Sequence, residues 1–313
     1  MPGSAPAQQN LPLIFSQWHY GGLCLIWEVS VKSFWARALA SPYIRLLIGI
    51  VLVVTPVIVM RAVMLALNIH QALAVDIAAL DSALLSLLGY WFLVRRIEKR
   101  SVAELAAAGA PRELALGLLV GAALFAAVLG ALALFGVYRY TGTAPASVLI
   151  KPFVAAVASG IFEELLFRGL LFRLIESAIG SWLALAVSAV IFGLLHLLNP
   201  HATLLGAGAL ILEAGVLLAA AYLLTRRLWL PIGMHIAWNF TQGGIFGLVV
   251  SGSGASIGLF NGVLSGPVWL SGGEFGAEAS VVAVIICLGV AIGFLAIAVR
   301  RRHILPAPWQ RAD

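Results

Sequence analysis

The sequence alternates long apolar runs with short polar clusters. A helix needs about 20 mostly apolar residues to cross roughly 30 Å of hydrocarbon, and the longer runs meet this length. The pattern predicts eight spans, at residues 44–67, 76–94, 113–137, 150–174, 181–198, 203–224, 229–250 and 280–299. We therefore expect an all-α polytopic membrane protein of about eight transmembrane helices.

Two further regions are not predicted to span. Residues 13–40 are apolar and rich in tryptophan, but they are interrupted by Glu28, Lys32 and Arg37. This mixture favours an amphipathic helix lying in the membrane interface, although a span is the alternative. Residues 251–279 are rich in glycine and serine, which is typical of a loop.

The chain is predicted to fold as one membrane domain of four consecutive parts. Residues 1–43 form a tail and the interfacial helix, and residues 44–149 hold the first three spans. Residues 150–250 form a core in which polar residues recur within the spans. Residues 251–313 contain the Gly-rich loop, the last span and a basic tail.

Composition and charge exclude several classes of protein. The chain is 62% hydrophobic and only 10% charged. A soluble domain has about 25% charged residues. The formal net charge of +6 could suit nucleic acid, but the basic residues lie in short clusters between apolar runs, so no nucleic-acid partner is expected. Cys24 and Cys287 lie far apart and give neither a disulfide framework nor a thiolate metal site.

The basic clusters predict the orientation. Placing the N-terminus inside puts all basic residues on or near the cytoplasmic side except Arg61, Arg139 and Lys151, as expected for a membrane protein. Both termini are then cytoplasmic and the Gly-rich loop faces out. The protein is expected in a bacterial cytoplasmic membrane.

Ionisable residues recur within the spans of the core. Each costs about 2.5–3.5 kcal/mol at bilayer depth, so it usually faces a partner or a polar cavity. Three patterns stand out: EExxxR, FxxxH and HxxxN. Their polar members are Glu163, Glu164, Arg168, His196, His235 and Asn239.

Helical spacing separates the two glutamates. Glu164 and Arg168 are four residues apart, so they share a face and are predicted to pair, and this pair could serve only to hold the helix. Glu163 is turned away by about 100° and is the freer carboxylate, which could act as a general base toward water. His235 and Asn239 also share a face.

Each histidine also has a purely structural interpretation. His196 could cap the end of its helix, and His235 with Asn239 could join helices by hydrogen bonds. Other charged residues in the spans lack partners at helical spacing and are predicted to serve packing or helix ends. These residues are Arg61, Asp76, Asp81 and Glu213.

The segments EELLFRG, FGLLH and LWLPIGMHIAWN, in this order on successive spans, resemble the CPBP intramembrane proteases. This family includes the type II CAAX prenyl endopeptidases and bacterial proteins of bacteriocin processing or immunity. The resemblance covers roughly residues 150–250, and RRIEKRSVAEL and GGEFGAEAS are similar to further segments of bacterial members. It implies a helical bundle enclosing a polar cavity, and an intramembrane endopeptidase acting on a membrane-associated peptide or protein.

The resemblance also implies roles for the polar residues, with Glu164 and Arg168 accompanying the catalytic glutamate. In one mechanism Glu163, His196 and His235 bind Zn²⁺, which activates a water molecule. In the other no metal is present, Glu163 and His196 activate the water, and His235 with Asn239 donates hydrogen bonds to the oxyanion. The sequence lacks HExxH, the common zinc-protease motif.

The predicted span ends place the three catalytic candidates at different depths. Counting about 1.5 Å per residue from the cytoplasmic ends, Glu163 lies about 17 Å deep, His235 about 9 Å and His196 about 22 Å. A shared site requires tilt, a kink or displaced helix ends. A non-enzymatic transporter or immunity factor using the same polar cluster is the alternative function, followed by a structural partner of other membrane proteins.

Overall fold

The computed structural model describes residues 38–254 and 256–310. The chain divides into two compact units, Met1–Ser41 and Pro42–Asp313. The predicted interfacial helix at residues 13–40 lies almost wholly outside the described residues. The second unit holds the spans and the core.

Within the described residues, seven helices are long and apolar enough to cross a membrane, and they match seven of the eight predicted spans. Two of them are composite, because a π-helical segment joins two α-helices into one continuous rod. The helices are α2 (Pro42–Ala66), α3 (Ala72–Phe92), α4 (Ala110–Leu134), α5 (Ile150–Glu164) continuing to α6 (Arg173–Ile179), α7 (Ser181–Leu195), α8 (Leu204–Leu210) continuing to α9 (Val216–Thr225), and α12 (Val281–Arg300).

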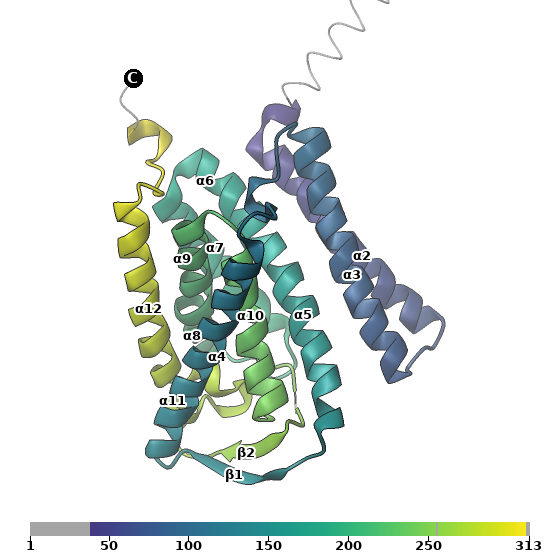
Figure 1. Cartoon of the computed structure of the whole chain (residues 1–313), viewed down its shortest axis with the longest axis vertical. Helices are drawn as coiled ribbons and strands as arrows, with labels where there is room; N and C mark the ends of the chain where they lie inside the picture. Colours follow the sequence, from purple (N-terminus) through teal and green to yellow (C-terminus); the bar gives the residue numbers. More distant parts are fainter. Residues whose placement is uncertain (1–37, 255, 311–313) are drawn as a thin grey trace, which may run out of the picture. The chain divides into compact units, whose positions relative to one another are not determined.

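The predicted span at residues 229–250 differs from this pattern. It consists of α10 (Trp229–Asn239) and a π-helical turn (Phe240–Ile245), and the chain beyond is irregular. Gly247 there adopts a left-handed φ of 60°. Residues 230–238 of α10 are all buried, because neighbouring helices surround it, α4 and α5 among them (Figure 1). The helix is therefore an interior element, shorter than a full span.

The predicted loop at residues 251–279 contains regular structure. Strand β2 (Phe260–Leu264) pairs antiparallel with β1 (Tyr138–Thr143), and helix α11 (Val268–Ser271) follows. The two strands lie at the end of the bundle opposite α6 (Figure 1). The pattern of apolar and polar residues does not predict this sheet, because the strands are only 6 and 5 residues long and β2 lies within the Gly- and Ser-rich stretch.

Charged residues cluster where α3 ends. Glu98 accepts from Arg100 and from Arg173 of α6, at 2.7 and 2.8 Å. Burial alone would raise the pKa of Glu104, but hydrogen bonds from Arg100 and Tyr90 hold it below its ordinary value. The segment RRIEKRSVAEL thus ties the end of α3 to α6.

Helices α4 and α10 pack backbone against backbone. A Cβ atom added at Gly117 would meet the Leu230 carbonyl oxygen, and one added at Gly121 would meet that of Met234. Gly233 on α10 has the same relation to α4. Small residues allow membrane helices this close approach. The glycines therefore fix the position of α10.

Replacing Gly121 with alanine is expected to lower the free energy of unfolding by about 1–3 kcal/mol, because the added methyl group must displace the α10 backbone. Gly130, on the same helix, has no neighbouring atom within 4 Å of an added Cβ. Gly130→Ala should leave stability unchanged or raise it by up to about 1 kcal/mol through helix propensity. Thermal unfolding in detergent measures both. Equal stability of the two variants would contradict the close-packing interpretation.

Candidate active site

The glutamate pair ends α5, and the helix continues as a π-helical segment, Leu165–Phe172, that carries Arg168. Arg168 pairs with Glu164 at 2.8 Å, and the side chains are 1% and 0% exposed. This confirms the predicted pair. Arg168 also donates to the carbonyl oxygens of Ala214 and Gly215, at 3.1 and 3.2 Å, and its guanidinium carbon lies 4.7 Å from the ring centre of Phe192. The pair thus fastens α5 to the segment between α8 and α9.

His235 on α10 extends this ion pair. Its Nδ1 lies 3.0 Å from Oε1 of Glu164. Because Glu164 is paired with Arg168, its carboxylate is an acceptor and the ring must donate from Nδ1. The other ring nitrogen, Nε2, lies 3.8 Å from Oε2 of Glu163.

His196 is held in an equivalent way at the end of α7. Its Nδ1 lies 2.8 Å from the carbonyl oxygen of Phe192, one turn earlier. A carbonyl can only accept, so Nδ1 carries a proton. Nε2 then lies 3.8 Å from Oε2 of Glu163. His196 therefore caps its helix and faces the glutamate at the same time.

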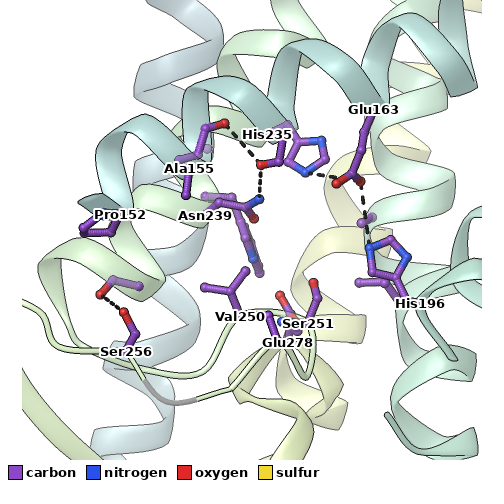
Figure 2. Close-up of a pocket in the computed structure, with 18 of the residues that line it drawn as sticks. Pro152, Ala155, Glu163, His196, His235, Asn239, Val250, Ser251, Ser256 and Glu278 are labelled. Carbon is purple, nitrogen blue, oxygen red and sulfur yellow. Dashed lines mark hydrogen bonds and ion pairs between the residues drawn. The ribbon is translucent and has the colours of Figure 1, made fainter. Parts of the chain in front are cut away.

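Glu163 is the point on which both rings converge (Figure 2). Its Oε2 atom is buried and has no hydrogen-bond partner among the described residues. In the neutral form of each histidine, Nε2 is also an acceptor. Three acceptors that face one another at this distance suit a small hydrogen-bond donor such as water.

Asn239 lies one helical turn after His235 and lines the same cavity. Its Nδ2 donates to Oγ of Ser159 on α5, at 3.3 Å. An amide nitrogen has two N–H groups, so one remains for another acceptor. Figure 2 shows Asn239 beside His235, as their spacing predicts.

The structure also resolves the disagreement in depth. The fourth span continues to Ile179. Counted along the helix, Glu163 then lies about 24 Å from the end of this span, close to the depth of about 22 Å for His196. On α10, Met234 packs at the level of Gly121 of α4, which places the neighbouring His235 about 17 Å from the start of α4. The later end of the fourth span thus accounts for the depth of Glu163. Helix α10 begins at Trp229, where the span was predicted to begin, so the depth of His235 follows instead from the position of α10 beside α4.

Five of the six predicted residues, all but Asn239, are linked in one network of ion pairs and hydrogen bonds beside a cavity of about 760 Å³. Glu163, His196, His235 and Asn239 line it, while Glu164 and Arg168 lie behind His235. Glu213 and Glu278 line it too. The interpretation of Glu213 as a packing residue is thus incomplete, and no role was predicted for Glu278.

For each of these two glutamates, one feature of the sequence points to a functional role. Glu213 is an acid inside a span without a basic residue at helical spacing, and Glu278 lies in the segment GGEFGAEAS. Burial raises the pKa of Glu278 to about 7. A carboxyl group with such a perturbed pKa in a cavity is typical of a functional site.

Some features of a zinc site are present in the two histidines. His196 and His235 each have one nitrogen anchored and the other directed at Glu163, as metal-binding histidines do. However, no group of three His, Cys, Asp or Glu side chains within the described ranges is arranged to hold a metal ion. The residues as placed therefore do not form a metal centre.

Comparison with known proteins gives a consistent result. Residues 145–241, which span α5 to α10 and include all six residues, match the family model described as type II CAAX prenyl endopeptidase Rce1-like. A Bacillus subtilis (strain 168) protein described as "Putative membrane peptidase YdiL" is 31% identical over 86 residues, which is 28% of this chain and 33% of that protein. The alignment thus spans a third of the relative's length. No solved structure matches the chain significantly. On this evidence the chain carries, at residues 145–241, a domain of the type II CAAX prenyl endopeptidase Rce1-like family.

Proposed function

We propose that this protein is an intramembrane endopeptidase that hydrolyses a peptide bond of a membrane-associated peptide or protein. The observation that carries this proposal is the convergence of Nε2 of His196 and Nε2 of His235 on the unpartnered Oε2 of Glu163, at 3.8 Å each. The cavity around them has a volume of about 760 Å³. Such a volume is large enough for a short stretch of peptide. A purely structural role gives no reason for two imidazole nitrogens and a carboxylate oxygen to face one another at the wall of a cavity of this volume.

The chain's own residues supply each step. Glu163 takes a proton from a water molecule that His196 orients, and the water oxygen attacks the peptide carbonyl carbon. Asn239 donates to the resulting oxyanion through its amide, and His235 does so in its protonated form. Glu163 then gives its proton to the leaving nitrogen as the C–N bond breaks. Glu164 and Arg168 hold His235 in position throughout.

The site as placed does not form a metal centre, so no step of this mechanism passes through zinc. Zn²⁺ held by Glu163, His196 and His235 is the competing version, in which the metal would supply an acidic water molecule. The two versions predict different responses to a chelator.

The seven candidate spans of the described residues show an integral membrane protein. We place it in a bacterial cytoplasmic membrane, with both termini on the cytoplasmic side. Several arginines lie at the α6 end of the helices, among them Arg100, Arg173 and Arg226. Positive residues accumulate on the cytoplasmic side of membrane proteins, which supports this orientation.

Cleavage of a quenched fluorescent peptide library by the detergent-purified protein tests the proposal. We expect His196→Ala to lower kcat by about 10²- to 10⁴-fold, because the water loses its orienting group. His201→Ala is the matched control, since its side chain is 47% exposed and pairs only with Glu274 among the described residues.

A chelator should leave cleavage by the wild-type protein unchanged. Loss of cleavage that Zn²⁺ restores would instead select the metal version.

Two results would count against a peptidase. One is wild-type protein that cleaves no peptide in detergent or in lipid vesicles. The other is equal activity of His196→Ala, His201→Ala and wild type. Either result would favour the non-enzymatic transporter or immunity factor.

A further inference from the structure

Two carboxyl groups of the cavity wall have no part in the mechanism above. Glu213 lies in the π-helical segment Ile211–Gly215, and Glu278 lies in the short 3₁₀ turn Ala277–Ala279 before α12. Both line the cavity that contains Glu163, although they are only 2% and 1% exposed. Figure 2 shows Glu278 beside Ser251 in this pocket.

The carboxylate of Glu213 is incompletely bonded. Its Oε1 accepts from the thiol of Cys287 at 3.6 Å, and a thiol is a weak donor. Its Oε2 is buried and has no hydrogen-bond partner in the described part of the chain. Glu278 accepts from the backbone N–H of Ser251. A buried acceptor without a donor is costly, so Oε2 of Glu213 is suited to a donor brought by a bound molecule.

Within the described residues, the two carboxyl groups also lack a permanently charged cationic partner, although the positive charge of His235 acts on Glu278 when that ring is protonated. Among the described residues, no lysine or arginine forms an ion pair with either, and the charge of Glu278 acts on Glu213. The cavity wall carries these two glutamates and Glu163 against a single lysine, Lys151, in the described part of the chain. Like charges in a buried site oppose each other's ionisation, and a cation between them removes that opposition.

We propose that Glu213 and Glu278 form an acidic subsite that binds the basic side chain, lysine or arginine, of a substrate residue near the scissile bond. The inference rests on the proposed peptidase function. An ammonium or guanidinium group brings N–H donors to Oε2 of Glu213 and forms strong charge-assisted hydrogen bonds. An apolar side chain of equal length leaves Oε2 of Glu213 without a donor and brings no cation to the two carboxyl groups, so the site discriminates against it.

Matched peptides test the subsite. Each pair is identical except that a lysine near the cleavage position is replaced by norleucine, and the lysine is moved through the positions on either side. At one position we expect wild type to prefer lysine by about 10- to 100-fold in kcat/KM, as hydrogen bonds to a charged group allow. Glu213→Gln and Glu278→Gln should each reduce this preference while cleavage of the norleucine peptide is retained. Glu274→Gln, in the same segment but 84% exposed, should keep the preference.

The outcomes separate this inference from the function on which it rests. Wild type that cleaves both peptides equally at every position overturns the subsite and leaves the peptidase standing. Gln variants that lower cleavage of both peptides equally show a structural role and also overturn it. Wild type that cleaves no peptide overturns the proposed function, and the subsite with it.

Discussion

Glu163→Gln is expected to lower kcat by about 10³-fold, within the range for loss of a general base. Glutamine has the shape of glutamate, but its amide cannot take a proton from water. The carboxylate of Glu163 has no cationic partner apart from the two histidines, and its Oε2 makes no hydrogen bond among the described residues. The substitution should therefore leave the thermal stability close to that of wild type. Steady-state cleavage and thermal unfolding in detergent measure the two effects.

Asp81→Asn is the matched control for Glu163→Gln, since it also changes an acid to an amide within a helix that spans the membrane. Asp81 is exposed on α3 and does not line the cavity, so activity should persist. A glutamine at position 163 that supports wild-type cleavage would remove the general base from the mechanism. If the protein is instead a non-enzymatic scaffold, Glu163→Gln should not impair the function of that scaffold.

The sequence was sufficient to group the polar residues of the site. The spacing of four residues predicted the partner of Glu164, and the structure confirms it. The cost of polar groups in lipid explains why separate helices direct theirs into one cavity. The depths of Glu163 and His235 were not predictable in the same way. They depend on where a helix ends and on backbone contacts such as that of Gly121 with Met234, which involve another helix.

The parts that the sequence did not predict share this dependence on distant residues. Strand β1 is paired with a segment more than a hundred residues away, and α10 is buried because other helices enclose it. Glu213 was interpreted from its own helix, where it has no partner. Its surroundings, including Glu278 and Cys287, come from other elements.

Arg168→Met is expected to destabilise the protein by about 3–5 kcal/mol, the usual result of removing one partner from a buried ion pair. The substitution leaves the fully buried Glu164 without its cation, and it also removes the hydrogen bonds to Ala214 and Gly215. Methionine fills a similar volume, so lost charge rather than lost packing dominates the change. Thermal unfolding in detergent measures it, with Arg61→Met, an exposed arginine on α2, as the control.

A second substitution distinguishes the effect of the uncompensated Glu164 charge from the effect of the lost hydrogen bonds to the carbonyl groups. If the uncompensated charge of Glu164 is the cause, the double variant Glu164→Gln with Arg168→Met should recover part of the lost stability, because no buried charge remains. Activity should stay low in the double variant, since His235 keeps only a neutral acceptor at Nδ1 and is less firmly oriented. A double variant as unstable as Arg168→Met would assign the effect to the lost carbonyl contacts. Full activity in the double variant would show that the ion pair holds the helices but does not position His235.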